Sequence, residues 1–422
     1  MGQPSPVGKA WGLLALLFVA LWGMLALGLH RNFTSRRALV IWDFAPLWHG
    51  AQVLFREDGS PYDREVAARV MQESYGRPAR SGEDSRAFSY PLYALYLVAP
   101  LFWMSRPWAQ AVWLATLLAA FLVGSMAVWR VWQRPVRGWQ AGAFLVGLLF
   151  LYPVTWALLL GQMAVWVFAW VALSLWALER GRDRWAGGFL ALSTVKPHLV
   201  ALLVPVTLLW SARRRRWGVW QGFGLVEGTL VGTSWMLLPR WPVAFLQAVQ
   251  RYAESRPFVS PWRMVLEGSL PQDLASVVYL GSVAVLGLGW LVAVGRMPHP
   301  RAWPWVAAFT LVLTFFLVPR AHVADQVVLV YPLWGWFWST PGSARFRGLV
   351  RGGFLALGVG YWVFHNYWLV NVPRPAPVVE MLQHRALSPL LPGLLLGLGL
   401  YIGFLQMRTK AMDRGRPQKG EA

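Results

Sequence analysis

The stretch WAQAVWLATLLAAFLVGSMAVWRV, residues 108–131, is an apolar run whose only ionisable side chain is Arg130, near its end. A transmembrane helix needs roughly 17–25 predominantly apolar residues to cross a hydrocarbon core of about 30 Å. The run meets that length, and its apolar character is continuous rather than alternating. This stretch therefore predicts a membrane-spanning helix.

Runs of the same kind recur along the chain. Hydrophobic residues make up 57% of the 422 residues and charged residues only 14%, whereas a soluble domain carries about 25% charged residues. We expect apolar segments at 11–29, 89–104, 108–131, 139–158, 163–178, 186–210, 219–238, 273–294, 302–318, 323–340, 353–370 and 387–406. The predicted fold class is all-α and polytopic, with about 11–13 membrane segments.

The formal net charge of +21 comes from arginines clustered between the apolar runs. Such clusters are typical of cytoplasmic loops under the positive-inside rule, where anionic lipid headgroups are the partner. The charge therefore favours membrane lipids, and no nucleic acid, as a partner. The chain contains no cysteine, which excludes disulfides, thiolate catalysis and cysteine-based zinc sites.

One membrane domain is predicted over residues 1–422. Residues 30–88 hold nine arginines and eight acidic residues, so this segment is charge-balanced and predicts a small folded cap. Short helices are expected in it near Pro46–Phe55 and Asp63–Tyr75, with Asp63 as an N-cap. Placing the basic connectors in the cytoplasm puts the cap on the outer side of the plasma membrane.

The same orientation assigns the remaining polar segments. A second loop, residues 239–272, is expected on the outer side, and the basic tail, residues 407–422, in the cytoplasm. The run 186–210 is expected to break at Lys196-Pro197, because proline interrupts the helical hydrogen bonds. The short run 89–104 is flanked by prolines and is a candidate re-entrant segment. Irregular backbone at membrane depth is tolerated only beside protein or a watery cavity, so the sequence predicts a cavity open to the outside.

Asp43 is the candidate catalytic residue. It lies in the motif WDFAP, residues 42–46, just after the first apolar run. A carboxylate next to the membrane is costly and tends to mark a functional site, and it can accept the proton of an attacking hydroxyl. If the hydroxyl attacks a sugar that is linked to a lipid phosphate, the phosphate is a good leaving group and needs no acid. A single carboxylate then suffices as the base. The alternatives are an N-cap for the helix near Pro46 and an ion pair with Arg37.

Tyr90 and Gln162 are candidate substrate-binding residues in the cavity wall. Tyr90 opens the apolar segment that follows the cap, and Gln162 joins two apolar runs and offers both a donor and an acceptor for a sugar hydroxyl. Each has a plainer interpretation: an interfacial tyrosine before a helix-starting proline, and an ordinary turn between helices.

The motif TVKPH, residues 194–198, adds Lys196 and His198 to the predicted binding site. A lysine inside an apolar run is expensive, and a lysine at a broken helix suits a phosphate group. The alternative is that its ammonium group reaches the membrane surface.

A short polar link carries Arg320, His322 and Asp325. Arg320 suits a phosphate or pyrophosphate, and His322 and Asp325, three residues apart, can share one helical face. The alternative is an internally satisfied polar cluster. A metal site is not favoured, because the seven histidines are dispersed along the chain. Glu227, alone in its apolar run, is either a packed acid or a lining group.

Taken in order, several motifs resemble glycosyltransferase family 87. They are an Asp after the first apolar run, GSPYD at 59–63, YP at 90–91, GQ at 161–162, AGGFLALSTVKPH at 186–198 and RAHVAD at 320–325. The resemblance covers roughly residues 40–330. This chain has Pro91-Leu92 where the family commonly has Pro-Pro, and Met163-Ala164 where it often has an Asn soon after the Gln. Both departures concern the substrate more than the fold.

The resemblance implies a GT-C-type bundle with a catalytic Asp in the first extracytoplasmic loop, which corresponds to Asp43. It implies inverting transfer of a hexose, with mannose the best-known case, or of a pentose. The donor would be a polyprenyl-phosphate sugar and the acceptor a lipid, glycan or protein hydroxyl, with no metal or other cofactor. The phosphate contacts of Lys196 and Arg320 are inferred from charge and topology. The alternatives are a transporter or flippase of a lipid-linked sugar, and a structural membrane subunit.

Overall fold

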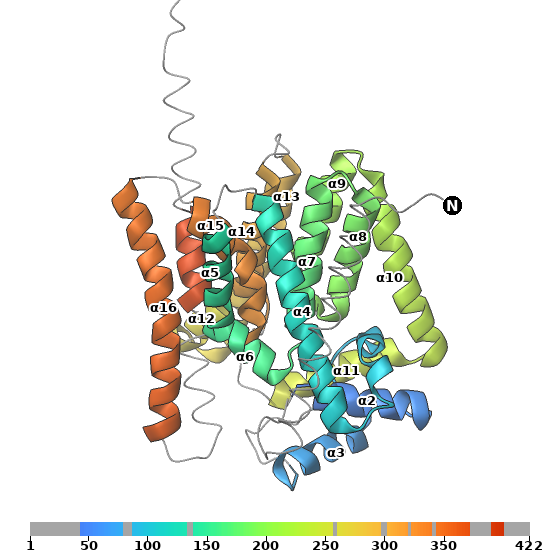
Figure 1. Ribbon diagram of the computed structural model, residues 1–422. Coiled ribbons are helices and arrows are strands. Elements are labelled where there is room, and N and C mark those ends of the chain that lie inside the picture. Colours follow the sequence, from blue (N-terminus) through green and yellow to red (C-terminus); the bar gives the residue numbers. More distant parts are fainter. Residues whose placement is uncertain are drawn as a thin grey trace, which may run out of the picture.

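The structure is a computed structural model that describes residues 43–78, 87–132, 138–255, 260–296, 302–319, 322–339, 343–371 and 390–400. The ordered elements within these ranges are helices, and no strand is among them. They stand side by side in a bundle (Figure 1). The predicted all-α fold is therefore confirmed. The predicted segment 11–29 and the basic tail 407–422 lie outside the described residues.

Two described helices, α4 (Arg106–Trp132) and α13 (Gln272–Arg296), are each long and apolar enough to cross a membrane. The run predicted at 139–158 forms α5 (Gly138–Leu149) and α6 (Tyr152–Leu160), which are bent by 60° and together have the length of one span. Shorter apolar helices are α7 (Ala164–Glu179), α14 (Trp303–Leu317) and residues Leu390–Leu400. These lengths support a membrane protein, and the count of about 11–13 segments stays a prediction.

Both segments expected to be irregular are irregular. The run 186–210 divides into α8 (Asp183–Leu192), η3 (Ser193–Val195), η4 (Pro197–Val200) and α9 (Leu203–Arg213). The break falls at Lys196, since Pro197 cannot donate the backbone hydrogen bond that would continue the helix. The run 89–104 contains the short 3₁₀ segments η1 (Leu92–Leu97) and η2 (Ala99–Leu101) rather than an α-helix. The chain therefore leaves the regular α-helix at two places within its apolar runs.

The two ends of the bundle differ in charge. At one end, the turn before α8 and the turn before α10 (Trp217–Leu237) are joined by Arg216, whose Nε lies 3.0 Å from Asp183 Oδ1. Arg213 donates to the carbonyl of Gly295 in the last turn of α13, at 2.9 Å. Arginine-rich connectors from separate parts of the sequence therefore gather at one end.

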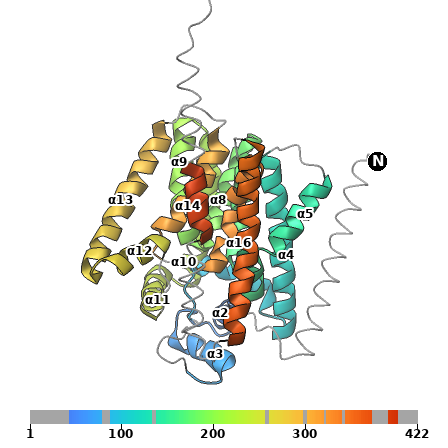
Figure 2. The same ribbon diagram turned by 90° about the vertical axis from the view of Figure 1, so that its left-hand side faces the viewer.

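The opposite end carries the cap (Figures 1 and 2). It contains α2 (Ala45–Arg56), α3 (Arg64–Tyr75) and α11 (Trp241–Ser255). Both short cap helices were predicted, and α3 does begin after Asp63. The Asp63 side chain makes no capping hydrogen bond, so only the position of that N-cap was right.

The C-terminal half completes the bundle with α12 (Pro261–Ser269), η6 (Val323–Leu329), α15 (Val330–Ser339) and α16 (Ala344–Asn371). Ser260 is the N-cap of helix α12, and its hydroxyl accepts from the Arg263 backbone N–H. The η6 segment packs against α6, α7 and α14. It thereby reaches the centre of the bundle, where the candidate site lies.

Helices α8 and α10 approach each other closely through glycine. A Cβ placed on Gly222 would lie 1.9 Å from the carbonyl oxygen of Arg184, and one on Gly187 would lie 2.0 Å from that of Val219. Backbone atoms cannot move aside as a flexible side chain can, and small residues are what permit such close approach between membrane helices.

We expect Gly222→Ala to lower the stability of the protein, because the added methyl group forces α8 and α10 apart. Overpacking of this kind costs about 1–3 kcal/mol. The matched control is Gly224→Ala on the same helix, where a Cβ would meet nothing within 4 Å. Alanine there should be neutral or slightly stabilising. Thermal unfolding of both variants in detergent measures the difference, and equal midpoints would contradict the close packing.

Candidate active site

Four polar residues from distant parts of the sequence meet where helices end or break. Asp43 lies two residues before α2, Gln162 lies between α6 and α7, Lys196 lies between η3 and η4, and Asp325 lies in η6. The Asp43 backbone N–H donates to the carbonyl oxygen of Leu160, at 3.0 Å. This bond holds the start of the cap against the end of α6. Phe44, not Asp43, is the N-cap of α2.

Gln162 joins the carboxylate to the ammonium group. Its side-chain Nε2 donates to Asp43 Oδ2, and its Oε1 accepts from Lys196 Nζ at 2.7 Å. The preceding Gly161 ends α6 with a φ of 73°, a left-handed conformation that glycine adopts without strain. Trp113 Nε1 donates to the Gly161 carbonyl at 2.9 Å, which anchors this turn to α4. The amide is therefore held in one orientation at both ends.

Lys196 and Asp325 form a buried ion pair, with 2.5 Å between Nζ and Oδ1. Their side chains are only 8% and 5% exposed. The ring centroid of Tyr90 lies 5.9 Å from the same ammonium group, within the range of a cation–π interaction. Lys196 therefore does not extend to the membrane surface, and the alternative of a snorkelling lysine is wrong.

The two histidines flank the acid of this pair. His198 Nε2 lies 3.6 Å from Asp325 Oδ2, and the His322 backbone N–H donates to the same oxygen at 3.1 Å. The His322 imidazole Nδ1 in turn accepts from the Ala324 N–H, which completes a capping box at the start of η6. The polar link therefore forms the internally satisfied cluster that was the alternative interpretation. Its acid, Asp325, also binds Lys196.

Seven of the eight predicted site residues lie in this one cluster: Asp43, Tyr90, Gln162, Lys196, His198, His322 and Asp325. Arg320 lies outside the described residues. The predicted role of Gln162 needs one adjustment. Its amide binds Asp43 and Lys196, and its contact with a sugar hydroxyl stays a prediction. The spacing of these residues along the sequence gave no sign of that contact.

A second polar group adjoins the first and was only partly anticipated. Thr194, two residues before Lys196, donates from its hydroxyl to Glu227 Oε2 at 2.9 Å. The Tyr93 hydroxyl lies 3.1 Å from the Thr194 hydroxyl and 3.5 Å from Glu227 Oε1. Glu227 is thus a hydrogen-bonded acid in α10. A lone acid in an apolar run requires such donors, but the sequence did not identify Tyr93 and Thr194 as the partners.

Comparison with known families bears on this cluster directly. The model of glycosyltransferase family 87 matches residues 88–328, more than half of the chain. The chain belongs to glycosyltransferase family 87. The matched range holds Gln162, Lys196 and Asp325, so the inner part of the site lies in the family's own region. No curated protein matches the chain.

Membership in glycosyltransferase family 87 makes this membrane protein an enzyme, with a sugar donor and an acceptor as its substrates. The alternatives of a transporter and a structural subunit are thereby set aside. Asp43 precedes the matched residues. Its place in the site therefore depends on its contact with Gln162, a residue inside the match.

Proposed function

We propose that this glycosyltransferase moves a hexose, with mannose the first candidate, or a pentose from a polyprenyl-phosphate donor to an acceptor hydroxyl, with Asp43 as general base. One observation carries the proposal: a single amide, Gln162, binds both the Asp43 carboxylate and the Lys196 ammonium group. A base for the attacking hydroxyl and a cation for the leaving phosphate are the two groups that a one-step sugar transfer needs.

The transfer is a single displacement with inversion at the anomeric carbon. The acceptor oxygen forms a bond to that carbon, and its proton passes to the Asp43 carboxylate. The bond between the anomeric carbon and the phosphate oxygen breaks, and the polyprenyl phosphate leaves with the electron pair. A phosphate needs no proton to leave, so the step uses one carboxylate, unlike the paired carboxylates of glycoside hydrolysis.

Lys196 is the proposed contact for the donor phosphate. An ammonium group has three N–H donors, and two of them bind Gln162 and Asp325. The remaining donor would bind a phosphate oxygen, with His198 and Arg320 as further candidates and with Tyr90 and His322 lining the site. Asp325 keeps the ammonium group in place. Because its charge is balanced by this acid, Lys196 can remain buried before the donor arrives.

The proposed orientation places the cap outside the plasma membrane. The arginine-rich turns around Asp183, Arg213 and Arg216 lie at the opposite end of the bundle, as the positive-inside rule requires of the cytoplasmic face. Anionic headgroups would contact these turns. The donor lipid would then lie in the outer leaflet, and the acceptor would be an extracytoplasmic lipid, glycan or protein.

A panel of donors tests the proposal. Purified protein is incubated with polyprenyl-phosphate mannose, glucose and arabinose and with candidate acceptors, in the presence of EDTA. We expect one donor to be consumed, with release of polyprenyl phosphate and an inverted anomeric centre in the product. Consumption of a nucleotide sugar in place of all three lipid donors would contradict the proposal. So would an activity that EDTA abolishes and added metal restores.

A further inference from the structure

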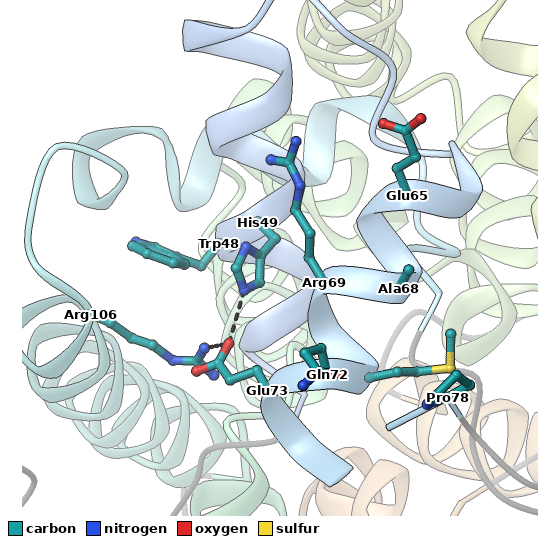
Figure 3. Close-up of a pocket in the computed structure, with 10 residues that line it drawn as sticks. Trp48, His49, Glu65, Ala68, Arg69, Gln72, Glu73, Pro78 and Arg106 are labelled. Atoms are coloured by element: carbon teal, nitrogen blue, oxygen red, sulfur yellow. Dashed lines mark hydrogen bonds and ion pairs between the residues drawn. The ribbon is translucent and has the colours of Figure 1, made fainter. Parts of the chain in front are cut away.

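The cap contains a pocket of about 840 Å³ between α2, α3 and the start of α4 (Figure 3). Trp48 and His49 line it from α2, and Arg106 lines it from the first turn of α4. Glu73, Gln72 and Ala68 line it from α3. None of its lining residues belongs to the cluster around Lys196.

The charges that line the pocket are balanced within the protein. Glu73 forms an ion pair with Arg106 and accepts from His49 Nε2 at 2.9 Å. Burial and the nearby Arg106 lower the pKa of His49 to about 4. Arg69 is likewise held by both oxygens of Glu57, at 2.7 and 2.9 Å. Glu65 and Glu73 together with Arg69 and Arg106 give the lining two negative and two positive charges, so the pocket has no net charge with which to select an ion.

The remaining groups suit a neutral ligand that carries many hydroxyls. Trp48 provides a large aromatic wall, of the kind that combines an apolar surface with a polar edge. The exposed Gln72 offers an amide donor and acceptor. Arg106 Nη2 is buried and has no hydrogen-bond partner among the described residues. Its guanidinium carbon lies 5.8 Å from the Trp48 ring centroid. An apolar face next to donors and acceptors matches a sugar ring.

We propose that this pocket binds a sugar of the acceptor that is remote from the reacting hydroxyl, so that the acceptor is an oligosaccharide chain. The inference rests on the proposed function and adds the class of acceptor. Asp43 lies two residues before α2 and His49 is the fifth residue of that helix. At roughly 1.5 Å per helical residue and at most about 3.6 Å for each of the two residues before it, their backbones are about 13 Å apart or less. A short oligosaccharide spans that distance. The donor sugar does not extend to the pocket, because it is attached to the phosphate. The proposed phosphate contact, Lys196, is buried in the bundle.

The test fills the pocket without removing any of its hydrogen-bonding groups. Ala68 is exposed on α3 and lines the pocket, so Ala68→Trp places an indole in it. The matched control is Arg64→Trp, an exposed position one turn earlier on the same helix that does not line the pocket. Saturation-transfer NMR on the full-length protein in detergent then measures binding of methyl glycosides. The series runs from mono- to tetrasaccharides of mannose, glucose and arabinose.

We expect the wild type and Arg64→Trp to bind the longer members of one series, and Ala68→Trp to lose that binding. In the transfer assay, KM for the tetrasaccharide should rise roughly tenfold in Ala68→Trp, the effect of losing about one hydrogen bond to a charged group. Arg64→Trp should keep the wild-type value.

Equal binding by the wild type and Ala68→Trp would overturn the proposal, and so would a wild type that binds no member of any series. A different result concerns the proposed function alone. If oligosaccharides bind the wild type, fail to bind Ala68→Trp, and are never glycosylated from a lipid donor, the pocket is supported and the transfer reaction is not.

Discussion

Asp43→Asn should abolish nearly all sugar transfer while leaving donor binding intact. General-base catalysis is worth roughly 10²–10⁴-fold in rate, and Asn cannot accept the proton of the acceptor hydroxyl. Its side-chain oxygen can still accept from Gln162 Nε2, the contact that holds residue 43 in the wild type. We therefore expect kcat to fall by two to four orders of magnitude, roughly, with a nearly unchanged donor Kd. Product formation from labelled donor and donor binding, measured on the same preparation, give both values.

The control is Asp63→Asn, another acid of the cap. Asp63 is exposed and its side chain makes no capping hydrogen bond, so this variant should transfer sugar at the wild-type rate. A kcat for Asp43→Asn that is only a few-fold below the wild-type value would contradict the role of Asp43. A wild type that moves the lipid across the membrane without transferring its sugar, together with an Asp43→Asn variant that still binds and moves the lipid, would instead support a flippase.

The sequence was most informative where one residue type carries an unusual cost. Asp43 and Lys196 were identified because a charged group beside or inside an apolar run needs a reason to be there. The break at Lys196-Pro197 followed from the missing N–H of proline. Cap helices near Pro46–Phe55 and Asp63–Tyr75 were found within about one residue of α2 and α3.

The contacts between these residues could not be predicted in the same way. Gln162, Lys196 and Asp325 are separated by long apolar stretches, and nothing in their local pattern specifies which helix ends meet. Asp325 pairs with Lys196, a contact that the sequence did not predict, and its expected contact with substrate stays a prediction. The approach of α8 to α10 depends on the positions of Gly187 and Gly222. Nothing in the sequence distinguished those two glycines from the others, so the crossing itself required the structure.

Lys196→Met should cost both stability and activity. The substitution leaves Asp325 buried and without its cation, and removing one partner of a buried ion pair typically costs about 3–5 kcal/mol. The variant should therefore unfold at a clearly lower temperature than the wild type in the same detergent. It should also fail to transfer sugar, because the donor phosphate loses its cation. Taken alone, that loss of activity would not separate a misfolded site from a missing phosphate contact.

The double variant Lys196→Met/Asp325→Asn distinguishes a misfolded site from a missing phosphate contact. It has neither charge, so the energetic penalty of an unpaired buried acid disappears, and neutral replacements of buried ion pairs are often no less stable than the pair. The asparagine side chain of this variant can still accept from the His322 N–H, which Asp325 binds at 3.1 Å in the wild type. We expect thermal stability to return to near the wild-type value while transfer stays undetectable, since no cation meets the leaving phosphate. Activity that returns together with stability would show that Lys196 serves only to balance Asp325, and the phosphate contact would have to lie elsewhere.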